Sequence, residues 1–367
     1  MSFKELLSQE NSNVLRGLAI MAIMLHNFFH YGFGFSSENE GNYIEENVNN
    51  FFIAINSGHT NIIAEILSFL GWIGVPVFIF LTGYGLSIKY PLQLLYKTET
   101  DKVLYDFPVN ERKRYLKHSF LKLFWLMLPA ILFFLLIDVI KQETWIHFIK
   151  RLSYLLMLPN LAYPLLKVNP GVYWYFGLTF QFYVFYFIAR KRLSLWNLLI
   201  YSVLSIAGVY IAVMIKNPLL ISWYRATFAG WFSVFAIGVW SAKYRESLNF
   251  NSSVLSETIC VIILFVLIIW MNTNILAWLF IPIVALLWFC TLAKIICRVH
   301  FLKKLLVWIG HYSACIFVCH PIVRLLGRKT YTLTDNLFLT VSIYLAITFG
   351  LALVYMRIYK KLLTYSK

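Results

Sequence analysis

Apolar residues come in long runs along this 367-residue chain, and that pattern restricts its fold more than any other feature. Runs such as 119–140 and 336–356 have about the twenty residues that a helix needs to cross a bilayer core roughly 30 Å thick. Only 13% of the residues are charged, whereas an ordinary soluble chain carries about 25%. The sequence therefore excludes a soluble globular enzyme, a disordered protein and a disulfide-stapled secreted module. It predicts a polytopic membrane protein.

The expected architecture is an all-α bundle of about ten spanning helices that forms one integral-membrane domain over residues 1–367. The predicted spans are 14–34, 62–88, 119–140, 172–189, 196–214, 226–242, 253–271, 275–293, 305–326 and 336–356. Between the third and fourth spans, Pro159 and Pro164 interrupt the stretch 141–168. We expect that stretch to form an interfacial helix followed by an outer loop.

Basic residues are distributed unequally between the two faces that these spans define. Of the 32 Lys and Arg residues, 23 fall on the face that carries both ends of the chain. The positive-inside rule assigns that face to the cytoplasm. The net charge of +16 is then explained by membrane topology, and it does not indicate a nucleic-acid-binding surface. We expect both termini to be cytoplasmic.

Arg16 and His26 are among the polar side chains of the first span, and the burial of such side chains in a membrane is costly. At a rise of about 1.5 Å per residue, His26 lies roughly 15 Å above Arg16, near the middle of the bilayer. A neutral imidazole at that depth can accept a proton at neutral pH. The position alone is equally compatible with a structural histidine that bonds a neighbouring helix.

Four segments, in order along the chain, resemble the motifs of the membrane acyltransferase-3 family. Arg16 and His26 resemble the Arg and His pair on the family's first helix, and 71–84 resembles its Gly-x-x-Gly-Val helix. Trp174 with Gln181-Phe182-Tyr183 is similar to the family's Trp…Gln-Phe-Tyr span, and 309–321 is similar to its late helix ending in His-Pro. The resemblance covers almost the whole chain and implies a helical membrane enzyme.

The activity that this resemblance implies is an O-acyl transfer at a bacterial plasma membrane. The family moves an acyl group, usually acetyl, from cytoplasmic acyl-CoA to a hydroxyl of a cell-surface or exported polysaccharide or glycolipid. The implied cosubstrate is acetyl-CoA. The implied partners are a glycan or lipid-linked sugar acceptor, membrane lipids and glycan-assembly proteins.

Residues of the first two spans suit this chemistry. An alcohol is a poor nucleophile at neutral pH, so a general base must remove its proton as it attacks the thioester. His26 is the expected base, and Arg16 is expected to orient it or to offset charge. The developing oxyanion needs donors, for which Asn27, Thr82 or backbone groups near Gly83 are candidates. Direct attack and a route through an acyl-histidine both fit.

A basic segment opens the third span, where the family's usual Arg-x-x-Arg cluster is replaced mainly by lysines. The phosphates of CoA would be attracted to such a segment. Inner loops beside anionic lipid are basic in any case, so an anchoring role fits equally well. The candidate donor-binding residues are Arg112, Lys113, Arg114, Lys117 and Lys122.

The acceptor path is expected to involve Trp174, Gln181, Tyr183 and His320, because all four belong to the matched motifs. His320 precedes Pro321, so a role in capping a Pro-kinked turn is the alternative for that residue. His311, Cys315 and Cys319 share one helix face. Small residues that pack between helices are commoner there than a soft-metal site, so no metal is expected.

A membrane exporter of a polysaccharide or lipid-linked sugar is the alternative function. Ten helices with intramembrane His and Arg suit transport as well as catalysis. Against transport, the sequence shows no paired discontinuous helices in repeated halves, which mark many secondary carriers. Consumption of an acyl thioester by the purified protein separates the two functions.

Overall fold

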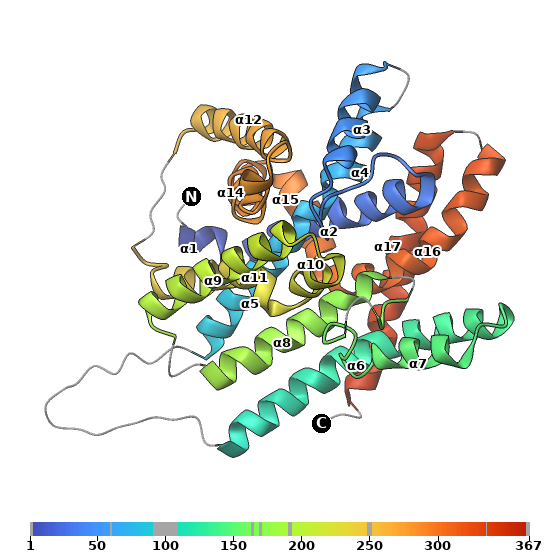
Figure 1. The fold of residues 1–367 in the computed structure, drawn as a ribbon, viewed down its shortest axis with the longest axis horizontal. Coiled ribbons are helices and arrows are strands. Elements are labelled where there is room, and N and C mark those ends of the chain that lie inside the picture. Colours follow the sequence, from blue (N-terminus) through green and yellow to red (C-terminus); the bar gives the residue numbers. More distant parts are fainter. Residues whose placement is uncertain are drawn as a thin grey trace, which may run out of the picture.

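The structure is a computed structural model that describes residues 3–58, 61–90, 109–162, 165–168, 171–189, 193–247, 252–334 and 336–364. Within these ranges the chain is helical and contains no strand. Figure 1 shows a bundle in which α2 lies near the centre and α12 and α17 lie at the periphery. The basic residues at 190–192 and most of the connection 89–118 fall outside the described residues.

All ten predicted spans are helical. They correspond to α2 (Gln9–Phe28) with the π-helical turn η1 (Phe29–Phe33); α4 (Ile62–Leu70), η2 (Gly71–Gly74) and α5 (Val75–Lys89); α6 (Val109–Ile140); η3 (Gly171–Tyr173) and α8 (Trp174–Ala189); α9 (Leu195–Met214); α11 (Phe228–Lys243); α12 (Val254–Met271); α13 (Ile275–Trp278) and α14 (Ile281–Ile296); α15 (His300–His311) and α16 (Ser313–Thr334); and α17 (Leu337–Thr364). The other helices are α1 (Phe3–Leu6), α3 (Glu45–Asn56), α7 (Trp145–Ser153) and α10 (Pro218–Ala226).

The number of helices that qualify as spans is smaller than the predicted ten. In the described part of the chain, seven helical segments are long and apolar enough to cross a membrane. An eighth is obtained if α15 and α16, which meet at a bend of 75°, form one broken span. The helices α11 and α14 have 16 residues each, which at about 1.5 Å per residue falls short of a 30 Å core. The count of ten is therefore not confirmed.

Two helical segments form the interior of the bundle. In the most apolar stretch of α2 with η1, 67% of the residues are buried, and in that of α4 to α5 the share is 72%, against 17% for α12 and 22% for α17. Small residues permit the close packing of α2. A Cβ on Gly17 would collide with the backbone of Leu306 on α15, and one on Gly71 would collide with His26. The helix with the candidate base is thus the central one.

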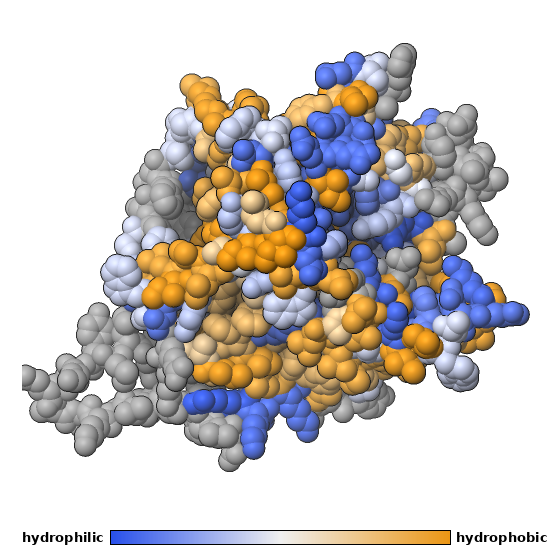
Figure 2. All heavy atoms as spheres, viewed as in Figure 1, coloured by the Kyte–Doolittle hydropathy of each residue, from blue (hydrophilic) through white to orange (hydrophobic). Residues whose placement is uncertain are grey.

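The outer surface is apolar in the way that a bilayer requires. Exposed Leu199, Ile200, Val203 and Leu204 lie on α9. Figure 2 shows this apolar surface over α9, while hydrophilic side chains gather around α3 and at the start of α6. A multi-pass integral membrane protein has this distribution of side chains.

A short helix, α7, lies where the sequence predicts an interfacial one. Trp145, Ile146 and Ile149 are exposed on it, while Arg151 is buried. The Arg151 guanidinium donates to both carboxylate oxygens of Asp138 at the end of α6, over 2.8 Å and 2.7 Å. A bidentate pair of this kind holds α7 against the C-terminal end of α6.

Polar contacts join segments that the predicted topology assigns to the same face. Lys4 pairs with Glu246 at 2.9 Å, and Glu10 pairs with Lys303 at 3.2 Å. On the opposite face, Arg225 Nε donates to the backbone oxygen of Glu40 over 2.6 Å. Which face is cytoplasmic follows from the positive-inside rule alone and stays a prediction.

Candidate functional site

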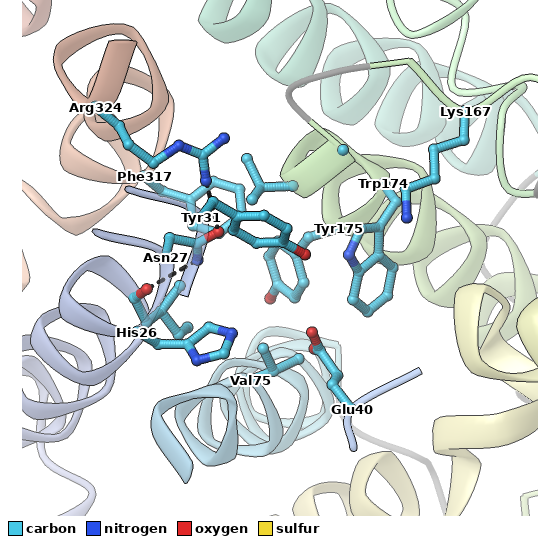
Figure 3. A pocket seen from close by; sticks show the side chains of 13 residues that line it. His26, Asn27, Tyr31, Glu40, Val75, Lys167, Trp174, Tyr175, Phe317 and Arg324 are labelled. Carbon is cyan, nitrogen blue, oxygen red and sulfur yellow. Dashed lines mark hydrogen bonds between the residues drawn. The ribbon is translucent and has the colours of Figure 1, made fainter. Parts of the chain in front are cut away.

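A cavity of about 90 Å³ opens beside the second half of α2. Its lining comes from α2 and η1, from the loop that follows them, from α5, from Lys167 and η3 before α8, and from α8 and α16. His26, Asn27, Trp174, Tyr175 and Arg324 point into the same open space in Figure 3. Because one water needs at least about 10–15 Å³ of accessible cavity volume, the cavity holds a few waters or the reactive end of a substrate.

His26 is held in one orientation by the helix that follows in the chain. Its side chain is only 3% exposed, and its Nδ1 lies 2.7 Å from the backbone oxygen of Ser68 on α4. A carbonyl oxygen only accepts, so Nδ1 carries the proton in this hydrogen bond. The other ring nitrogen, Nε2, then has a free lone pair and faces the cavity (Figure 3). This is the tautomer that a general base needs.

A chain of hydrogen bonds fixes the Ser68 segment that holds His26. The Ser68 hydroxyl donates to the backbone oxygen of Ser36 over 2.8 Å. The amide of Ser36 donates to Glu65 Oε2 over 2.9 Å, and its hydroxyl donates to the same oxygen. Glu65 is 4% exposed. The buried carboxylate therefore fastens the loop after η1 to α4, directly behind His26.

The local sequence explains how the chain leaves α2 at this point. Residues 29–33 form a π-helical turn, a rare conformation that is frequent at functional sites. Gly34 ends the turn with φ of 71°, a left-handed conformation that glycine adopts at low cost. His30, inside the turn, stacks on His26 with ring centroids 5.5 Å apart.

Asn27 and Arg324 meet on the cavity wall. Arg324 Nη1 donates to Asn27 Oδ1 over 3.2 Å, and its guanidinium lies 4.8 Å from the ring of Tyr31. Asn27 Nδ2 donates to the backbone oxygen of Ile23 over 2.8 Å. Thus one amide hydrogen of Asn27 is used inside α2, and a guanidinium stands beside the reaction space.

Polar groups also form the outer wall of the cavity. Glu40 and Lys167 line it together with Trp174, whose ring stacks on Trp231 with centroids 6.3 Å apart. Burial, with the neighbouring Glu38 as second cause, raises the pKa of Glu40 to about 8. Burial also raises the pKa of Glu38. Opposite charges, mainly from Arg225 and Lys167, partly offset this penalty.

Arg16 lies in the N-terminal half of α2 and does not belong to the cavity lining. Its Nη1 donates to Asn13 Oδ1 of the same helix over 2.8 Å. Thr82, on α5, lies between Arg16 and His26. Its hydroxyl donates to the backbone oxygen of Phe78 over 2.8 Å and is within hydrogen-bonding reach of the Tyr175 phenol. Tyr175 thus connects the cavity to a polar layer nearer Arg16.

The remaining acceptor candidates separate into three places. Gln181 Oε1 accepts from the amide of Phe228 over 3.0 Å, and its side chain borders an apolar groove. Tyr183 lies further along α8, with its ring 6.3 Å from that of Tyr115. His320 is fully buried behind the cavity-lining Phe317, with ring centroids 5.6 Å apart. Of the four acceptor candidates, the structure brings only Trp174 to the cavity with His26.

The basic segment occupies the first turns of α6. Lys113, Arg114, Lys117 and Lys122 are exposed there, and Arg112 is half-buried. None of the five lines the cavity around His26. Among the described residues, no group of three or more His, Cys, Asp or Glu side chains is arranged to hold a metal ion.

Sequence reasoning missed three charged residues of the cavity: Glu40, Lys167 and Arg324. Arg324 had a signal, because a charge inside the apolar run 305–326 is costly and marks a functional site by default. Glu40 and Lys167 had none, because they lie in connections where charged residues are ordinary.

The acyltransferase-3 family model, described as an acyltransferase domain, matches residues 10–357, which is nearly the whole chain. Neither a curated protein nor a solved structure matches. The resemblance inferred from four motifs is thereby confirmed.

Proposed function

This chain belongs to the acyltransferase-3 family, and on that premise we propose that it transfers an acyl group, usually acetyl, from cytoplasmic acyl-CoA to a hydroxyl of a surface or exported glycan. The observation that supports the proposal most is the burial and the hydrogen bonding of the His26 ring. A buried imidazole whose Nδ1 is bonded to a carbonyl presents Nε2 to a cavity with the geometry of a general base.

In this reaction Nε2 of His26 removes the proton of the acceptor hydroxyl as its oxygen attacks the thioester carbonyl. The carbon–sulfur bond breaks, and the proton passes to the departing CoA thiolate. The hydrogen bond from Nδ1 to the Ser68 oxygen stabilises the transient imidazolium. Transfer through an acyl group on Nε2 uses the same nitrogen, so both routes remain within the proposal.

Arg324 is the group that best suits the developing oxyanion. It lines the cavity and is anchored to Asn27, and a guanidinium is a stronger donor than a neutral amide. Asn27 then positions Arg324 and has a second amide hydrogen for the substrate. The Thr82 hydroxyl is engaged with Phe78, so its role is to bond Tyr175 rather than the oxyanion.

The donor and the acceptor approach from opposite ends of the protein in this proposal. Exposed cations at the start of α6 attract the phosphates of CoA. Arg16, Thr82 and Tyr175 lie between that end and His26, and we assign the path of the acyl thioester to this layer. The glycan or lipid-linked sugar reaches the cavity from the loop side, where Glu40, Lys167 and Trp174 stand.

The experiment that tests the function uses purified protein in nanodiscs, acetyl-CoA and de-O-acylated glycan from the producing cells. We expect release of CoA together with acylation of the glycan, measured by mass spectrometry. A protein that moves the glycan across a membrane without consuming the thioester would be the exporter instead.

A further inference from the structure

The loop 35–44 is fastened at several points, although it forms no helix of its own. Trp278 Nε1 donates to the backbone oxygen of Asn39 over 2.9 Å, and Arg225 Nε donates to that of Glu40 over 2.6 Å. The Asn47 amide donates to the oxygen of Glu38 over 2.9 Å. With the bonds from Ser36 to Glu65, helices α3, α4, α10 and α13 all fix the position of this loop.

One of these attachments is built around a buried cation. Arg225 is 6% exposed, and its guanidinium carbon lies 4.2 Å from the ring of Trp231, 5.0 Å from that of Trp278 and 5.7 Å from that of Trp72. Desolvating a guanidinium is costly, and cation–π contacts recover only part of that cost. Because burying Arg225 among three tryptophan rings is costly, we take its hydrogen bond to Glu40 as evidence that the position of the Glu40 backbone matters to the protein.

The Glu40 side chain is the part of the loop that meets the reaction space. It lines the cavity, and its carboxyl group points into the open space that His26 also faces (Figure 3). Within the described part of the chain, its buried Oε1 has no hydrogen-bond partner. Because a buried polar atom is normally bonded, this oxygen lacks the partner that a bound hydroxyl would supply.

Trp174 supplies a flat apolar surface on the same wall. Its ring is half-buried, lines the cavity and is backed by Trp231. A carboxyl group beside an aromatic face suits a sugar, whose ring presents hydroxyls at its edge and C–H groups on its face. A lipid chain or the acyl thioester group has no hydroxyl that could bond the carboxyl group beside the ring.

We infer that Glu40 and Trp174 form the acceptor subsite, in which the carboxyl group bonds a hydroxyl next to the one that is acylated. The sugar ring then lies against Trp174, and the neighbouring hydroxyl is directed at Nε2 of His26. The acceptor class is a sugar with two adjacent hydroxyls. This inference rests on the proposed function, because it names the acceptor side of that reaction.

The test measures initial rates of transfer while acetyl-CoA and the de-O-acylated cell glycan are varied separately. For Glu40→Ala we expect the KM for the glycan to rise about 10-fold, because the bound hydroxyl loses a buried partner, and a tenfold change corresponds to about 1.4 kcal/mol. The KM for acetyl-CoA should stay within about twofold, which also shows that the protein is folded. Glu40→Gln keeps one acceptor oxygen and should give an intermediate glycan KM.

The matched control is Glu46→Ala, because Glu46 is an exposed carboxylate on the neighbouring α3. It should leave both constants unchanged. An unchanged glycan KM in Glu40→Ala, or an equal rise in both constants, overturns the subsite. If the wild-type protein consumes no acetyl-CoA and acylates no glycan, the proposed function fails as well, and that result is read from the wild type alone.

Discussion

The two halves of α2 carry polar residues in opposite ways. In the C-terminal half, His26 and Asn27 are buried and bonded to groups on α4 and α16. In the N-terminal half, Arg16 bonds Asn13 of its own helix, and most of the basic residues at the start of α6 are exposed. Proton transfer needs atoms held within hydrogen-bonding distance, whereas attraction of a multiply charged donor needs only a local positive potential.

The variant His26→Gln tests whether the buried imidazole acts as the base. Glutamine retains hydrogen bonding to Ser68 but cannot take a proton, so we expect transfer to fall by about 10²–10⁴-fold. Membrane abundance should stay normal, because the neighbouring contact is conserved. Glycan acylation and protein level are measured in the same cells. Substantial activity at normal abundance would remove His26 from the role of base.

Glu65→Ala tests whether the buried network behind His26 positions it. Loss of the carboxylate frees Ser36 and the loop beside Ser68, and we expect the rate of transfer to fall about tenfold. Glu65→Gln, which keeps one acceptor oxygen, should recover part of the rate. A purely structural role would instead lower the amount of folded protein and leave the rate per folded molecule unchanged.

Joint neutralisation of Arg112, Lys113, Arg114 and Lys117 tests whether the basic segment of α6 attracts the acyl donor. Exposed charges contribute little individually, about 0.2–1 kcal/mol, so we expect a several-fold rise in the KM for acetyl-CoA. The salt dependence of that KM should weaken at the same time. If both quantities match the wild type, these residues only anchor the protein to the inner leaflet.

The smallest expected effect is the pH dependence of stability that arises from Glu40 in the cavity wall. Because the pKa of Glu40 rises from 4.5 to about 8 on folding, the folded state holds a proton that the unfolded state releases. This stability is complete below about pH 4.5 and is lost as the pH rises through about 8. We expect the Tm in nanodiscs to fall by several degrees across that window.

Glu40→Gln should show a flatter pH dependence of Tm over the same window. Some slope remains, because burial raises the pKa of Glu38 too. Equal slopes in the two proteins would show that Glu40 ionises freely and that the wall is hydrated.

The prediction from sequence succeeded where one stretch of chain suffices. Apolar runs predicted helices at all ten places, although only seven or eight of them qualify as spans in the described part of the chain. His26, predicted from its place in the first run, lines the cavity. The prediction was incomplete for the acceptor candidates. Gln181 and Tyr183, which share a motif with Trp174, and His320, which belongs to the late motif, do not line the cavity. Motif order along a chain does not specify which helix faces meet.

The sequence by itself determined the class of fold, because a run of apolar residues in a bilayer has to satisfy its backbone as a helix. It also placed Arg16 and His26 about 15 Å apart along one helix, since the helical rise per residue is constant. Only the tertiary structure decided that Glu40, Lys167 and Arg324 join His26 around one cavity. Those residues are far apart in the chain, and packing and hydrogen bonds between helices, rather than any local pattern, bring them together.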